Sequence, residues 1–230
     1  MTSASDRQGG LSHGGVAGAI PWQYDRAEMI ADGVVHGLGV LAGLIAATAL
    51  LTLSGVFASP REIVSIAIYV AGLLAMLGFS AAYNMWPVSP RKWFLRRFDH
   101  SAIYALIAAT YTPFVTQIKD TLFAALMLIG VWAVAAIGIA LKIVLPGRLD
   151  RVSIVLYIAL GWSGFLAYDA VAAAVPSTTL GLILAGGVLY TSGVIFHAWR
   201  GLRFQNAIWH CFVLLGAACH YTAVLDLVLA

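Results

Sequence analysis

Long runs of apolar residues, separated by short polar stretches, dominate this chain. Crossing the hydrocarbon core of a bilayer takes about 20 apolar residues in a helix, and seven runs are long enough. Only a short turn at Pro176 separates the fifth run from the sixth. The pattern predicts an all-α membrane protein, a bundle of seven transmembrane helices over residues 28–230, after a flexible tail over 1–27. The predicted spans are 29–54, 62–85, 99–117, 121–145, 152–174, 177–198 and 206–229.

The composition agrees with a membrane location. Hydrophobic residues make up 61% of the 230 residues and charged residues only 10%, whereas soluble domains carry about 25% charged residues. Lipid must therefore be the solvent for much of the apolar surface. No basic run is interleaved with aromatic residues as a nucleic-acid surface would require, so we expect no nucleic-acid partner. We expect a multi-pass protein of the cell (inner) membrane.

The basic residues predict the orientation. Lysine and arginine accumulate in the cytoplasmic loops of membrane proteins. All but two of the thirteen basic residues fall on the side of the predicted bundle that carries the N-terminus; the exceptions are Arg61 and Lys119. We therefore expect a cytoplasmic N-terminal tail and an external C-terminus.

Two pairs of glycines at four-residue spacing occur in the first predicted span. They are Gly33 with Gly37 and Gly39 with Gly43. Small residues at this spacing let two helices approach closely. Membrane helices also tolerate glycine without such a role, and the sequence alone leaves both interpretations open.

Polar residues gather near the cytoplasmic ends of four predicted spans, although polar groups inside lipid are costly. Several occur at i, i+4 spacing, which places them on one helix face. Each of these polar residues, taken alone, has a simpler structural explanation; Asp99, for example, would be a good N-cap of the third span. Their shared depth instead predicts one polar cavity. The residues concerned are Asp32, His36, Ser80, Asn84, Asp99, His100, Asn206 and His210.

A set of short motifs extends along the whole predicted bundle. They include Asp32-Gly33 and His36-Gly37, the stretch from Phe98 through Asp99 to Phe114, and Ile208-Trp209-His210. In these motifs the chain resembles the haemolysin III family, the bacterial branch of the progestin and adipoQ receptor (PAQR) superfamily. The resemblance implies seven helices around a cavity that opens near the cytoplasmic leaflet.

The resemblance also implies a zinc site. Receptor members of the superfamily hold zinc with one histidine of the second span and two histidines of the seventh. An aspartate of the third span and a serine of the second lie close by, and ceramide hydrolysis has been proposed for such sites. On this basis Ser80, Asp99 and His210 would be the catalytic residues, and His210 would be a metal ligand.

This chain departs from the family pattern at the two other ligand positions, which are Asn84 and Asn206. A neutral amide is a poor zinc ligand beside imidazole, since zinc favours nitrogen and sulfur donors. The resemblance implies zinc, but the residues favour a metal-poor site or one without a cofactor. Asp32, His36 and His100 could rebuild a metal site.

Three functions remain open from the sequence. The favoured one is a polar cavity that serves membrane lipid sensing or homeostasis, with a membrane lipid such as ceramide or a fatty-acid-like molecule as its partner. The alternative is a zinc-dependent intramembrane hydrolase of lipid amides, similar to a ceramidase. A cytolysin or pore ranks third, because a chain with so many apolar spans does not suit a soluble, secreted state.

Overall fold

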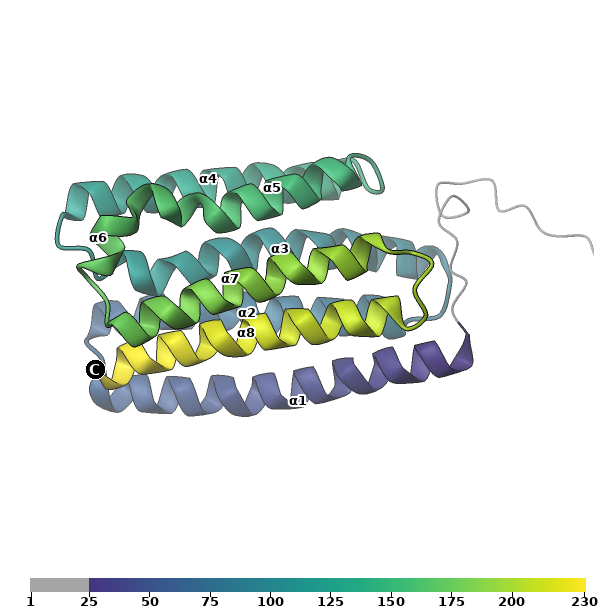
Figure 1. The fold of residues 1–230 in the computed structure, drawn as a ribbon, viewed down its shortest axis with the longest axis horizontal. Helices are drawn as coiled ribbons and strands as arrows, with labels where there is room; N and C mark the ends of the chain where they lie inside the picture. The colour runs from purple at the N-terminus through teal and green to yellow at the C-terminus, as the bar shows by residue number, and fades with distance from the viewer. Residues whose placement is uncertain (1–24) are drawn as a thin grey trace, which may run out of the picture.

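The computed structural model describes residues 25–230 and contains no β-strand within that range (Figure 1). The predicted tail, 1–27, lies almost wholly outside the described residues. The elements are α1 (Arg26–Phe57), α2 (Pro60–Met85), α3 (Pro90–Val115), α4 (Thr121–Val144), α5 (Asp150–Trp162), the short 3-10 helix η2 (Ser163–Ala167), α6 (Tyr168–Ala172), α7 (Ser177–Ala198) and α8 (Gln205–Leu229).

The long helices lie side by side along the long axis of the molecule (Figure 1). α8 packs along α7 and α1, α2 packs along α1 and α3, and α4 packs along α3. α5 lies next to α4 at one edge of the bundle (Figure 1). The two chain-distant helices α1 and α8 are therefore neighbours, which brings their polar ends together.

Among the described residues, six segments are long and apolar enough to cross a membrane: α1, α2, α4, residues 150–172, α7 and α8. The third predicted span, α3, is not among them. Its first half carries charged residues, including Lys92, Arg96 and Asp99. Because α3 packs between α2 and α4, much of its surface faces protein rather than lipid, and it can be more polar than its neighbours.

The start of α3 differs from the prediction. The apolar run begins near residue 99, but the helix begins nine residues earlier, at Pro90. Ser89 is the N-cap, and its side chain accepts a hydrogen bond from the backbone N–H of Lys92. Proline at the first helical position suits this start, because its missing N–H would have no partner there. The interpretation of Asp99 as an N-cap is therefore wrong, since it lies well inside the helix.

The fifth predicted span, 152–174, is not one continuous α-helix. It breaks after Trp162 into η2 and then α6. The hydroxyl of Tyr111 on α3 lies 2.8 Å from the carbonyl oxygen of Gly161 and accepts the backbone N–H of Gly164 at 2.7 Å. Backbone groups freed by a break inside a membrane must be satisfied by protein, and this tyrosine does so.

Only one of the two glycine pairs packs tightly. A Cβ atom added to Gly39 would lie 2.8 Å from a methyl carbon of Leu214, and one added to Gly43 would clash with Leu77. Gly33 and Gly37 have open space at the same position. The close-packing interpretation is confirmed for Gly39 and Gly43, whereas no side chain or backbone of residues 25–230 packs against Gly33 or Gly37 in this way.

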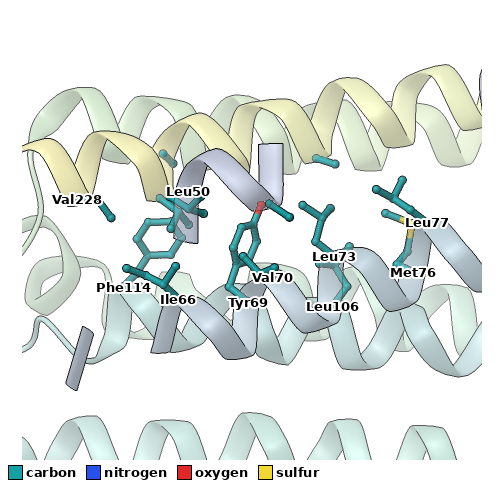
Figure 2. Packing of buried hydrophobic residues seen from close by; sticks show 14 of the residues in the cluster. Leu50, Ile66, Tyr69, Val70, Leu73, Met76, Leu77, Leu106, Phe114 and Val228 are labelled. Carbon is teal, nitrogen blue, oxygen red and sulfur yellow. The ribbon is translucent and has the colours of Figure 1, made fainter. Parts of the chain in front are cut away.

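The main apolar core lies where α2 meets α1, α3 and α8 (Figure 2). Tyr69 and Leu50 at its centre are almost completely buried. Large apolar residues are also widely exposed on the outer faces of α1 and α4, including Ile45, Leu126 and Ile129. Soluble monomers rarely expose such extended apolar faces, so these surfaces are suited to lipid.

Partly buried ion pairs connect three helices at one end of the bundle. Asp150, at the start of α5, accepts hydrogen bonds from Arg96 of α3 at 2.6 Å and from Lys142 of α4 at 2.8 Å. Only 7% of Arg96 and 2% of Lys142 is exposed. One carboxylate thus compensates two buried cations and holds α5 against α3 and α4.

Candidate functional site

A cavity of about 1500 Å³ runs through the bundle. At one end it is lined by polar and interfacial side chains such as Trp86, Lys92 and Arg200, and at the other by apolar ones such as Val115 and Leu180. Lys92 and Val115 are about 34 Å apart along α3 at 1.5 Å per residue. The cavity therefore extends over a depth comparable to the hydrocarbon core of a bilayer, about 30 Å.

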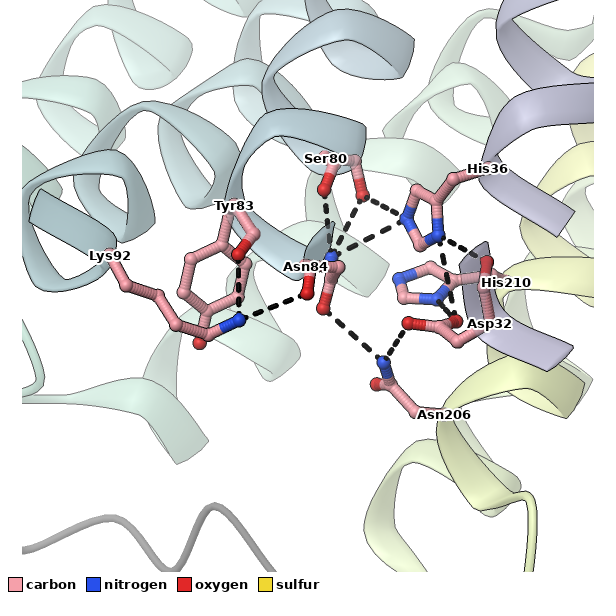
Figure 3. Close-up of polar contacts among 8 residues, drawn as sticks. All are labelled: Asp32, His36, Ser80, Tyr83, Asn84, Lys92, Asn206 and His210. Carbon is pink, nitrogen blue, oxygen red and sulfur yellow. Dashed lines mark hydrogen bonds and ion pairs between the residues drawn. The ribbon is translucent and has the colours of Figure 1, made fainter. Parts of the chain in front are cut away.

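Six of the predicted polar residues meet at the polar end of this cavity (Figure 3). We call them the Asp32 cluster. They come from three helices: α1 contributes two, and α2 and α8 contribute two each at i, i+4 spacing. The members are Asp32, His36, Ser80, Asn84, Asn206 and His210.

Asp32 is the centre of the cluster. One carboxylate oxygen, Oδ1, accepts a hydrogen bond from Nδ1 of His210 at 2.7 Å. The other, Oδ2, accepts from the side-chain amide of Asn206, also at 2.7 Å. Asp32 and His210 are 8% and 9% exposed. A carboxylate this deeply buried needs such partners, and α8 supplies both of them.

His36 is fixed by its own helix and by α2. Its Nδ1 lies 2.8 Å from the main-chain carbonyl oxygen of Asp32, which can only accept, so Nδ1 carries the proton. In the neutral ring Nε2 is then an acceptor, and it faces the hydroxyl of Ser80 at 3.2 Å and the amide of Asn84 at 3.4 Å. The rings of His36 and His210 meet edge to face, with centroids 4.2 Å apart.

The two asparagines contact each other. The Asn206 amide nitrogen donates to the side-chain oxygen of Asn84 at 3.2 Å. The Asn84 amide nitrogen donates to the main-chain carbonyl of Ser80, one turn earlier, at 2.9 Å. These two positions therefore face one another across the interface between α2 and α8.

Lys92 is a supporting residue whose role is not predictable from the sequence, where it counts only as one of the basic residues on the N-terminal side. Its ammonium group donates to the main-chain carbonyls of Tyr83, Asn84 and Trp86 at 2.8–3.0 Å. These carbonyls lie at the C-terminal end of α2, where a helix has acceptors without helical partners. Lys92 thus holds the end of α2 that carries Asn84.

Asp99 and His100 line the same cavity on α3. The Asp99 carboxylate lies 3.9 Å from Nε2 of His100. The main-chain carbonyl of His100 accepts a hydrogen bond from the hydroxyl of Tyr157 on α5 at 2.9 Å. The imidazole ring of His100 meets the ring of Tyr83 edge to face. The structure thus gathers six of the eight predicted residues in one network and places the other two on the cavity wall.

Comparison with known proteins identifies the family. A family model described as "Haemolysin-III related" matches residues 26–221. The chain belongs to the haemolysin III family. It is 37% identical over 199 residues to the Hemolysin-3 homolog of Bacillus subtilis, covering 86% of this chain and 93% of that protein. It is 34% identical over 203 residues to Hemolysin-3 of Bacillus cereus, covering 88% and 92%. It is also 31% identical over 167 residues to the human monocyte to macrophage differentiation factor, covering 68% and 67%. That similarity places the family within the PAQR superfamily.

The zinc site that the superfamily resemblance implies does not fit the residues at positions 84, 206 and 210. Two of the three are amides, Asn84 and Asn206. Their polar atoms form hydrogen bonds with each other, with the Ser80 carbonyl and with the Asp32 carboxylate. A different group of donors lies beside them. Asp32, His36 and His210 each offer one ligand atom, and these atoms lie within 4.8 Å of one another.

Proposed function

We propose that this haemolysin III protein spans the cell membrane seven times, with a cytoplasmic N-terminus and an external C-terminus. Six of the spans have the required length and composition. α3 would be the seventh, enclosed by its neighbours α2 and α4. The bias of lysine and arginine toward the N-terminal side supports the orientation.

We further propose that the protein binds one membrane lipid within the bundle, in a role in lipid sensing or homeostasis. The observation that carries this proposal is the change in character along the cavity, from the polar Asp32 cluster to an apolar depth. The lipid head group would meet the cluster, whose hydroxyl and amides offer both donors and acceptors. The acyl chain would occupy the apolar part, where its transfer carries no hydrogen-bonding cost.

A hydrolase of lipid amides is the second candidate. It is favoured by the presence of Ser80, Asp99 and His210 on the wall of the same cavity. The same lipid pose would bring the amide of a ceramide-like molecule to these side chains. A cytolysin role, which the names of the Bacillus relatives suggest, would be the third.

Filling the apolar depth of the cavity tests lipid binding. Leu184 of α7 lines this part, and Leu184→Trp would place an indole where the acyl chain is proposed to lie. We expect the purified wild type to retain a lipid at about one molecule per chain, because pockets of this kind bury most of a ligand. The variant should retain little, as measured by mass spectrometry of extracted lipid.

The matched control is Leu126→Trp on α4, because Leu126 is 60% exposed on the outer face and does not line the cavity. This variant should retain lipid like the wild type. Equal lipid content in wild type and Leu184→Trp, at equal monodispersity in detergent, would contradict the proposal.

A further inference from the structure

We infer that His220 forms a second polar subsite within the apolar depth of the cavity, and that this subsite binds a hydroxyl group on the acyl chain of the lipid. The ligand class is then a membrane lipid whose chain is hydroxylated near its middle. The inference rests on the proposed binding of a lipid within the bundle, and it adds which kind of chain the cavity selects.

His220 lies deep in the cavity, away from the Asp32 cluster. It lines the cavity together with Val213, and the seven-residue spacing places both side chains on one face of α8. Ten residues separate His210 from His220, which corresponds to about 15 Å along the helix. His220 is therefore deeper than the cluster by about half the thickness of the hydrocarbon core.

Two glycines make room for a pair of rings at this depth. A Cβ atom added to Gly186 of α7 would clash with the imidazole of His220. A Cβ atom added to Gly216 of α8 would lie 2.9 Å from the ring of Tyr190. Each ring therefore packs where the other helix has no side chain, and the two ring centroids are 5.4 Å apart. Close approach of the helices thus holds the imidazole in a fixed position.

One hydrogen bond determines which ring nitrogen of His220 is an acceptor. Nε2 lies 3.1 Å from the main-chain carbonyl oxygen of Ile183, which can only accept, so Nε2 carries the proton. In the neutral ring Nδ1 is then an acceptor, and it accepts no hydrogen bond from residues 25–230. A ligand group that pairs with this nitrogen must therefore be a donor.

The surroundings favour a hydroxyl as that donor. Neighbours along the cavity wall, such as Ile183, Leu184 and Val213, are apolar. A charged donor such as an ammonium group would be costly at this depth. A plain acyl chain would cover Nδ1 without pairing it, which also costs free energy. A hydroxylated chain supplies a neutral donor and keeps the rest of its length apolar.

Competition between two fatty acids tests the inference. Stearic acid and a stearic acid with one mid-chain hydroxyl, about 15 Å from the carboxylate to match the depth of His220, each displace a fluorescent fatty acid from the purified full chain in detergent. We expect the wild type to bind the hydroxylated acid about three to ten times more tightly, the usual net contribution of one hydrogen bond.

His220→Phe should reverse this preference. The phenyl ring has a similar shape but no acceptor, so the ligand hydroxyl would be buried without a partner, and the variant should bind plain stearic acid more tightly than the hydroxylated acid. The matched control is Tyr221→Phe, which removes a hydroxyl from the next residue of α8. That hydroxyl donates to the Ala46 carbonyl and does not line the cavity, so this variant should keep the wild-type preference.

The outcomes separate the hydroxyl subsite from lipid binding itself. If the wild type bound the hydroxylated acid no more tightly than stearic acid, the subsite would be overturned while lipid binding stood, and this comparison needs no variant. An unchanged preference in His220→Phe, or the same loss of preference in Tyr221→Phe, would also overturn it. If neither acid displaced the fluorescent fatty acid, the proposed lipid binding and the subsite would both be contradicted.

Discussion

Asp150→Asn is expected to lower the free energy of unfolding by about 2–3 kcal/mol, less than the roughly 3–5 kcal/mol of a fully buried ion pair, because the Asp150 side chain is 37% exposed and solvent screens it. The carboxylate of Asp150 accepts hydrogen bonds from Arg96 and Lys142, both almost completely buried. The amide has nearly the same shape but leaves two buried cations uncompensated. Reversible unfolding in detergent, followed by circular dichroism, measures the change.

Asp120→Asn is the matched control. Asp120 is exposed and caps the N-terminus of α4, where its carboxylate accepts hydrogen bonds from the backbone N–H groups of Leu122 and Phe123. Asparagine caps helices about as well as aspartate, so this substitution should change stability little. If Asp150→Asn cost no more than Asp120→Asn, the ion pairs would not hold α5 against α3 and α4 in the way proposed.

The second large effect is a gain of function. Asn84→His combined with Asn206→His should create a zinc site or tighten zinc binding by more than about 100-fold, because two imidazoles would replace two amides that are poor zinc ligands. Loss of a residue that only supports a ligand already costs about 10–100-fold in affinity, so two new ligands should contribute more. The two asparagine side chains contact each other at 3.2 Å, and His210 lies one turn from Asn206. The three imidazoles would therefore converge. Competition with a chelator of known affinity gives the magnitude.

Each single substitution is the control for the double variant. Asn84→His or Asn206→His alone supplies one new imidazole and should give a smaller gain. If the double variant bound zinc no better than the wild type, positions 84, 206 and 210 would not converge on one ion. That result would also count against the contact between the side chains at positions 84 and 206.

The apolar runs predicted most of the helices, because crossing a bilayer imposes both length and composition on a segment. They did not predict the start of α3, since the segment from Pro90 to Phe98 is charged and helical through its Ser89 cap rather than its apolarity. They also did not predict the break after Trp162. That break depends on Tyr111, a residue of another helix.

The candidate site was predictable in part. The i, i+4 spacing of Ser80 with Asn84 and of Asn206 with His210 indicated which faces carry polar groups. Which faces meet depends on how each helix is rotated about its axis, and that is set by packing elsewhere, such as Gly39 against Leu214. The sequence therefore predicted Asp32 only as one of several polar residues lining the cavity, whereas the structure places it at the centre of the hydrogen-bond network.

Labelling with a photoreactive lipid tests the central claim, that one lipid lies with its head at the Asp32 cluster and its chain in the apolar depth. A fatty-acid-like probe with a diazirine at the chain terminus would be activated in the membrane-embedded protein, and the labelled peptides identified by mass spectrometry. We predict labelling of cavity-lining residues such as Ile183 and Leu184 of α7, and its loss in Leu184→Trp. Labelling confined to the outer face, at residues such as Leu126 and Ile129 of α4, would contradict the account.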